Sequence, residues 1–281
     1  MTFSGHESFH CRLFWLKKGY DFIKAGKKFT EESAVVDLGV GKNMVSAIRH
    51  WLKAFGLLDD GDRLTTLADK IFGAKGWDPY LEHEGTLWVL HYHLTKKGYA
   101  SIFRLIFTEL RRNRPEFKKE HFYSLVSNYG GSFSKATLSK DFSAFQNMYI
   151  ASTSSKMELE DMYSGILTEL GLVQIRNDET LLIEGRRRPE LPALVVLYAI
   201  LESTRLRGSL SLSFEQLYTD AESVGSIFAL SKEGLVEKLQ EITQLYPNDI
   251  VFKNEAGIRE LQYKHKPEPF NVLKRYYGSQ V

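Results

Sequence analysis

The sequence of 281 residues contains a single cysteine, Cys11. One thiol cannot form an intrachain disulfide, and it excludes a zinc site built on paired cysteines. The longest apolar run, residues 191–201, includes Pro192 and is far shorter than the ~20 residues that a membrane span needs. The first residues also lack the basic start and uninterrupted apolar stretch of a secretory signal. These absences predict a cytoplasmic protein without a membrane segment.

The net charge is also small, at +2, so by itself it does not predict a polyanionic partner. Its distribution is uneven, because residues 96–140 contain ten Lys or Arg against three Glu, whereas residues 156–184 contain two basic and seven acidic residues. Such polarity can orient a protein on a nucleic acid, with the acidic segment turned away or held by a partner such as a second copy in a homodimer. Ordinary variation of surface charge explains it equally well.

Hydrophobic residues are plentiful, at 43%, which is enough for packed cores. The length suits two or three small domains. We predict a mainly α (α+β) fold of tandem winged helix-turn-helix modules with small β-hairpin wings. The predicted domains are residues 1–83, a second domain with a helical linker at 84–188, and a C-terminal domain at 189–281.

The first module is predicted at residues 30–72. A short helix at 31–38, a Gly39-Val40-Gly41 turn and a helix at 42–55 form the helix-turn-helix, and strands on either side of Asp59-Asp60-Gly61-Asp62 form the wing. In this layout the second helix enters the DNA major groove. The face of this helix that carries no apolar residues supplies the candidate DNA contacts. They are Lys42, Asn43, Ser46, Arg49, His50 and Lys53. Docking of a protein by the same module is the alternative, because a fold does not determine a function.

The second module repeats this organisation. Helices are predicted at 84–97, 101–112, 117–129 and 134–149, with a Gly130-Gly131 turn before the last one and a hairpin at 173–175 and 180–183. Basic residues surround the Pro115 break and the start of the last helix, where they can hold phosphate. The candidate contacts here are Arg111, Arg112, Arg114, Lys118, Lys119, Lys135, Thr137 and Lys140.

A third small module is predicted near the end of the sequence. Helices are expected at 192–204, 214–222 and 231–244, followed by a hairpin at 251–253 and 260–263.

One motif points to different chemistry. His6-Glu7-Ser8-Phe9-His10 matches the H-E-x-x-H pattern in which two histidines on a helix bind zinc and the glutamate activates water. Ser4-Gly5 directly precedes it, and the sequence offers no evident third ligand. The favoured interpretation is that His6 and Glu7 fix the N-terminal segment by hydrogen bonds or line a small polar site. We therefore predict a protein without enzymatic activity, metal or cofactor.

Several strings resemble the bacterial domain-of-unknown-function family 4007. They are Phe3-Ser-Gly-His-Glu-Ser-Phe9, Trp15-Leu-Lys-Lys-Gly19, Leu38-Gly-Val-Gly-Lys-Asn-Met-Val45 and Gly76-Trp-Asp-Pro-Tyr80, and the likeness continues at Thr137–Asp141 and Leu167–Leu172. In this family the position of His10 usually holds another residue, which weakens the zinc interpretation. The resemblance implies membership in mobile phage-defence gene clusters, beside sulfur-transfer enzymes of DNA phosphorothioate modification.

The modules and the resemblance together favour a DNA-binding accessory or regulatory protein of such a system. Its expected partners are double-stranded DNA and the sulfur-transfer or restriction proteins of the same system. The alternative is an adaptor that docks a sulfur-transfer or ATPase partner. A metal-dependent hydrolase that uses His6, Glu7 and His10 is a distant third.

Overall fold

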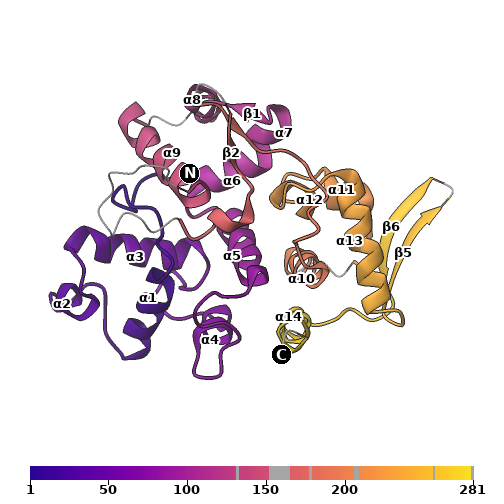
Figure 1. The fold of residues 1–281 in the computed structure, drawn as a ribbon, viewed down its shortest axis with the longest axis horizontal. Helices are drawn as coiled ribbons and strands as arrows, with labels where there is room; N and C mark the ends of the chain where they lie inside the picture. Colours follow the sequence, from indigo (N-terminus) through magenta and orange to yellow (C-terminus); the bar gives the residue numbers. More distant parts are fainter. Residues whose placement is uncertain (131–132, 152–164, 177–178, 206–208, 256, 280–281) are drawn as a thin grey trace. The chain divides into compact units, whose positions relative to one another are not determined.

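The computed structural model describes all residues except 131–132, 152–164, 177–178, 206–208, 256 and 280–281. The chain forms two compact units, residues 1–183 and 184–281 (Figure 1). Helices dominate both units and each contains a small antiparallel sheet, so the predicted mainly α fold with some β structure is confirmed. The boundary between the units lies close to the one predicted after residue 188, and the further division at residue 83 stays a prediction. Among the described residues, none of the helices combines the length and apolar character of a bilayer-spanning segment.

The first unit begins with an extended segment and four helices, α1 (Trp15–Lys24), α2 (Ala34–Leu38), α3 (Lys42–Ala54) and α4 (Thr66–Phe72). Gly39 ends α2 with a left-handed φ of 61°, which allows the tight turn into α3. The predicted wing after α3 is reduced to a bridge between Leu58 and Leu64, closed by a hydrogen bond from Asp59 N to Arg63 O (3.0 Å).

The next helices are α5 (Glu84–Lys97), α6 (Ser101–Leu105), the π turn η1 (Ile106–Leu110) and α7 (Arg111–Asn113). They lead through β1 (Glu116–Phe117) into α8 (Lys119–Asn128) and α9 (Lys135–Tyr149), and then through the 3-10 turn η2 (Thr168–Leu170) into β2 (Gln174–Ile175) and β3 (Leu181–Leu182). The sheet order is β1-β3-β2, with Phe117 and Ile175 both paired to Leu181. The sequence therefore predicted the β2–β3 hairpin correctly but missed β1.

An aromatic core joins the parts of the first unit. Trp51 of α3 contacts Phe103 of α6 (ring centroids 5.8 Å apart), and Phe103 in turn contacts Phe145 of α9 (5.5 Å). Behind them, Nδ1 of the buried His91 lies 2.7 Å from the Tyr149 hydroxyl. Because α3 and α9 contact the same rings, residues 1–183 share one core and form a single compact unit.

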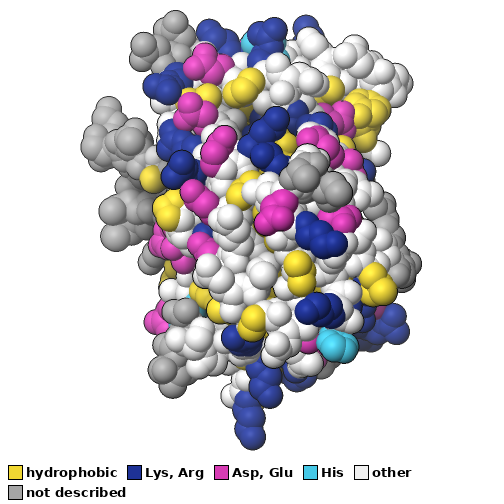
Figure 2. All heavy atoms as spheres, turned by 90° about the vertical axis from the view of Figure 1, so that its right-hand side faces the viewer, with side chains coloured by type: hydrophobic (Ala, Val, Ile, Leu, Met, Phe, Trp, Pro, Cys, Tyr) yellow, Lys and Arg dark blue, Asp and Glu magenta, His cyan; other side chains and the backbone are white. Residues whose placement is uncertain are grey.

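The second unit resembles the end of the first in having a helix, a strand, further helices and a hairpin in that order. It contains α10 (Ala193–Ser203), β4 (Ser211–Ser213), α11 (Phe214–Tyr218), α12 (Val224–Ile227), α13 (Lys232–Leu245), β5 (Ile250–Glu255), β6 (Ile258–Tyr263) and α14 (Pro269–Gly278). Helices α12 and α14 are additional to the shared order. The sheet order β4-β6-β5 matches the order in the first unit, with a longer hairpin. On the face drawn in Figure 2, basic and acidic side chains are interspersed and hydrophobic ones lie in small separate patches.

Candidate nucleic-acid interface

The start of α3 presents polar side chains to solvent, as predicted. Lys42, Asn43 and Ser46 are all exposed. They lie in the first two turns of the helix, directly after the Gly39 turn. This part of α3 is available to a partner.

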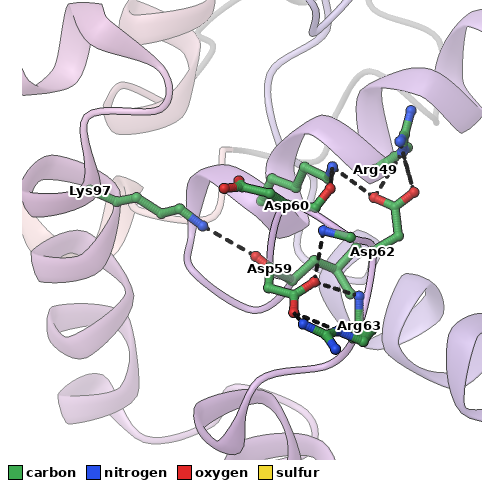
Figure 3. Close-up of polar contacts among 9 residues, drawn as sticks. Arg49, Asp59, Asp60, Asp62, Arg63 and Lys97 are labelled. Carbon is green, nitrogen blue, oxygen red and sulfur yellow. Dashed lines mark hydrogen bonds and ion pairs between the residues drawn. The ribbon is translucent and has the colours of Figure 1, made fainter.

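The middle of α3 is bonded to the acidic turn, Asp59-Asp60-Gly61-Asp62, which lies between the bridged residues Leu58 and Leu64. Arg49 donates from Nε to both carboxylate oxygens of Asp62 (3.0 and 2.9 Å), and its Nη2 lies 2.7 Å from Asp62 Oδ2 (Figure 3). Lys53 Nζ lies 2.8 Å from Asp62 Oδ1 and donates to the carbonyl oxygen of Asp60 (3.0 Å). Burial alone would raise the pKa of Asp62, but the hydrogen bonds from Arg49 and Lys53 outweigh it and keep that pKa below its usual value.

The acidic turn is itself well ordered by hydrogen bonds. Asp59 Oδ1 accepts from the backbone N–H groups of Gly61 and Arg63 (2.9 Å each), and Asp59 Oδ2 accepts from Arg63 Nε (2.8 Å). These bonds lower the pKa of Asp59, and the bond from the backbone N–H of Arg63 has the largest effect. Lys97 of α5 donates to the carbonyl oxygen of Leu58 (3.2 Å; Figure 3). The turn therefore lies in a fixed place beside α3.

Two of the predicted contact residues on α3 are far less exposed than expected, because His50 and Lys53 are only 6% and 7% exposed. The His50 ring packs against Trp51 and Tyr99, with centroids 5.1 and 5.2 Å away. Burial first, and then the nearby His6, lower the pKa of His50 to about 3. The spacing of apolar residues predicts that only one narrow side of α3 is buried. In the structure, segments distant in sequence also cover the other side of the last two turns, which includes His50 and Lys53.

The segment at residues 4–9 provides much of that cover. His6 stacks on Trp51 (5.6 Å, 22°), and the Trp51 indole N–H donates to Phe9 O (3.0 Å). Gly5 has φ 92° and lies so close to His50 that a Cβ would be 2.8 Å from Nδ1, so glycine is required here. Ser4, Glu7 and Ser8 also have left-handed φ values of 66°, 50° and 71°.

The same segment contacts α9. The backbone N–H of Ser4 donates to Asp141 Oδ2 (2.9 Å), and His6 Nε2 lies 3.4 Å from Asp141 Oδ1, with both side chains buried. Residues 6–10 are not helical, so the H-E-x-x-H string lacks the geometry that its zinc chemistry requires. In the described part of the chain, no three His, Cys, Asp or Glu side chains gather as metal ligands do. His6 therefore contacts Trp51 and Asp141, but neither of its ring nitrogens makes a hydrogen bond to a described residue, so the predicted anchoring of the segment by hydrogen bonds of His6 is not observed.

In the second half of the first unit, one further predicted contact is wrong. Arg111 is 8% exposed and donates from Nε to the carbonyl oxygen of Phe107 within the π turn (3.2 Å). The wider spacing of a π turn rotates Arg111 away from the exposed side that ideal α-helical periodicity predicts. Arg112 and Arg114 are exposed as predicted, and Arg114 Nη1 lies 3.0 Å from His121 Nε2.

A groove of about 610 Å³ lies between α8, α9 and the β2–β3 hairpin. The exposed residues Lys118, Lys119 and Glu120 line it at the start of α8, and Ile175 and Glu179 line it from the hairpin. The third wall is the face of α9. The α9 residues in this wall are Ser139, Phe142, Ser143 and Gln146.

The exposed face of α9 is basic and polar along its length. Lys135 and Lys140 are exposed as predicted, and Thr137 is half-buried, with its N–H bonded to the cap Ser134 Oγ (3.0 Å). The only acidic residue of α9 is Asp141, which is buried against Ser4 and His6. The residues predicted from the sequence lie in the first turns of this helix. The donors and acceptors further along, Ser143, Gln146 and Asn147, were missed, although their recurrence at helical spacing is visible in the sequence.

The corresponding helix of the second unit has the opposite character. On α13, Glu233 and Glu241 are exposed and Glu237 is half-buried, so carboxylates recur every four residues. Glu237 pairs with Arg187 (3.2 Å) and Glu241 pairs with Lys238 (3.5 Å), so two of the three carboxylates have a cation nearby. A phosphate backbone would be repelled by this face, because like charges at short range are unfavourable.

A second groove, which is apolar and has a volume of about 460 Å³, lies between α1 and α2. Phe14 and Tyr80 line it while remaining 53% and 63% exposed, and Val36 beside it is 82% exposed. Lys17 and Lys27 at its rim are paired with Asp21 and Asp37 (2.5 and 2.7 Å). Exposed apolar clusters of this kind are typical of protein-docking surfaces.

The fold is that of a mainly helical protein with two helix-and-hairpin units, of which the first has a polar groove beside α9. The chain belongs to the family described as protein of unknown function DUF4007, whose model matches residues 3–277. The predicted family membership is therefore confirmed.

Two solved structures resemble the whole chain. They are a magnesium ion-bound SspB crystal structure (TM-score 0.85) and an SspB crystal structure (TM-score 0.84). Each is 26% identical in sequence, and each alignment covers 99% of this chain and 88% of the other. No curated protein matches the chain.

Proposed function

We propose that this chain is a DNA-binding accessory protein whose second module, residues 84–183, contacts duplex DNA through α9. The setting is the one that the family resemblance implies, a bacterial phage-defence system based on DNA phosphorothioate modification. The observation that carries the proposal is the exposed face of α9, which has basic, hydroxyl and amide side chains and no exposed carboxylate. The groove beside it is lined by Lys118 and Lys119 together with Glu120 and Glu179.

The element order supports a winged-helix interpretation of this module. A helix, β1, α8, α9 and the β2–β3 hairpin follow one another, and the sheet order is β1-β3-β2. In winged helix-turn-helix proteins the helix that precedes the hairpin enters the major groove. That helix is α9, and the second unit repeats the order with α13 in the equivalent place.

The side chains of α9 suit the proposed role. Lys140 and Lys135 can neutralise phosphates, whereas Ser143, Gln146 and Asn147 can exchange hydrogen bonds with base edges. Lys118 and Lys119 across the groove add two more cations at the start of α8, where the helix dipole also favours an anion. The carboxylates of α13 make the second unit the poorer candidate.

A matched pair of charge insertions tests this assignment. Ser143→Glu on α9 and Gln240→Glu on α13 each add one negative charge at an exposed position of the corresponding helix. With a fluorescein-labelled 30-base-pair duplex and anisotropy at 50 mM salt, we expect Ser143→Glu to weaken binding at least tenfold and Gln240→Glu to leave it within twofold. Equal effects of the two would refute the assignment to α9, and absence of binding by the unmodified protein would refute DNA binding itself.

The second candidate function is that of a docking adaptor for a sulfur-transfer or ATPase partner. The observation that favours it is the apolar groove with exposed Phe14, Val36 and Tyr80 on the first helices. Tyr80→Ser and Val36→Ser should then abolish binding of such a partner and leave DNA affinity unchanged. Isothermal titration with the purified partner would separate the two functions.

A further inference from the structure

We propose that Arg49 and Lys53 of α3 form a second phosphate-binding site, which the carboxylate of Asp62 occupies when no nucleic acid is bound. This inference rests on the proposed function, because the ligand is a phosphodiester of the DNA backbone. It adds a contact from the first helices to the one proposed for α9, and it assigns the acidic turn the role of a competing anion.

The geometry around Asp62 is that of an anion site. Two cations converge on one carboxylate, with three contacts of 2.7 to 3.0 Å from Arg49 and one of 2.8 Å from Lys53. A guanidinium binds carboxylate and phosphate through the same forked arrangement of N–H donors. Asp62 therefore has the position and the charge of a phosphate group.

The site can be reached from outside. The Arg49 side chain is 40% exposed and that of Asp62 is 26% exposed, whereas Lys53 forms the floor at 9%. Lys42, Ser46, Arg49 and Lys53 recur at intervals of four, three and four residues, so they share one face of α3. Lys42 and Ser46 on this face are exposed and can contact the neighbouring phosphate.

Replacement of the Asp62 carboxylate by a phosphate breaks few contacts other than those of Asp62 with Arg49 and Lys53. The acidic turn is anchored independently by Asp59, which bonds to Gly61 and Arg63. Asp62 has a left-handed φ of 61°, and its side-chain contacts run to Arg49 and Lys53. A phosphate on Arg49 needs only the Asp62 side chain to turn aside, after which the turn lies next to the DNA backbone.

The test compares Asp62→Asn with Asp60→Asn. Both remove one negative charge from the same turn, and asparagine tolerates the left-handed backbone of residue 62. The Asp60 carboxylate is exposed, and its residue contacts α3 through its backbone carbonyl. Duplex affinity is measured by anisotropy from 50 to 200 mM salt, with circular dichroism as the check on folding.

We expect Asp62→Asn to bind duplex at least threefold more tightly than Asp60→Asn at 50 mM salt. The slope of log affinity against log salt should steepen by about 0.9, the value of one added phosphate contact, in Asp62→Asn alone. Adding Arg49→Gln to Asp62→Asn should abolish both the tighter binding of duplex and the steeper dependence of affinity on salt. This double variant also keeps the proposal testable if Asp62→Asn alters stability, since both proteins lack the same carboxylate.

The outcomes separate the two proposals. If the unmodified protein binds duplex and Asp62→Asn behaves like Asp60→Asn, the second phosphate site is refuted and the proposed function stands. If only Asp62→Asn binds, the site on α3 is supported and the assignment to α9 fails. If none of the proteins binds duplex, both proposals are refuted.

Discussion

Replacing Lys118, Lys119 and Lys140 with glutamine removes three exposed cations from the region of α8 and α9, two of which, Lys118 and Lys119, line the groove. Each phosphate contact contributes about 0.9 to the slope of log affinity against log salt, so losing three lowers the slope by about 2.7. Over the fourfold increase from 50 to 200 mM salt, the unmodified protein should then lose about 40-fold more affinity than the triple variant. The measurement is an anisotropy titration with a random 30-base-pair duplex at four salt concentrations.

A matched control is available in the second unit. Lys253, Lys264 and Lys274 are equally exposed, and their replacement by glutamine changes the net charge of +2 by the same three units. This variant should keep the salt slope of the unmodified protein. Equal slopes in the two triple variants would refute the reasoning, because the effect would then follow net charge rather than the position of the groove.

Two other predictions concern the buried polar groups Arg111 and His50, and a third concerns metal dependence. Arg111→Gln should lower the free energy of unfolding by about 1–3 kcal/mol in urea titrations, because the Phe107 carbonyl loses a buried donor, whereas the exposed Arg112→Gln should not change it. His50 has a folded pKa of about 3, so only the unfolded state takes up its proton below pH 6.5, and stability falls as the pH decreases. Between pH 6.5 and 5 the loss should be about 2 kcal/mol larger in the unmodified protein than in His50→Gln, and identical pH profiles would contradict the burial of a neutral ring. EDTA should leave duplex affinity unchanged, since the proposed contacts use Lys, Arg, Ser, Gln and Asn side chains; a loss of affinity restored by Mg²⁺ would show a metal-dependent contact.

Local sequence signals predicted most helices of this fold. The spacing of apolar residues placed α5 at residues 84–97, as observed, and α3 and α9 within one residue at each end. Strong periodicity and glycine turns are local, so they can be read without knowledge of the tertiary fold. The two-residue strand β1 was missed because it exists only through its pairing with β3.

The candidate site was harder to predict, because exposure depends on distant segments. His50 lies on the polar side of α3 in a helical projection, yet the segment at residues 4–9 covers it. Arg111 is buried because the preceding helix makes a π turn, which ideal periodicity does not include. Arg49 has the predicted position, but its ion pair with Asp62 depends on the conformation of the hairpin turn. Residue type therefore indicated the candidates, and long-range packing decided which of them are exposed.

The contact between Ser4 and Asp141 has a consequence for the order of folding. The two residues are 137 positions apart, and Asp141 is the inward anchor of α9. During synthesis, residues 4–9 can contact Trp51 of α3 but lack their contact with Asp141 until α9 has been made, so the cover over the last two turns of α3 is incomplete until then. Such long-range closure slows folding, because chain entropy is lost before the contact forms. We therefore expect that a nascent chain ending at residue 83 resists proteolysis less than one that extends through residue 183.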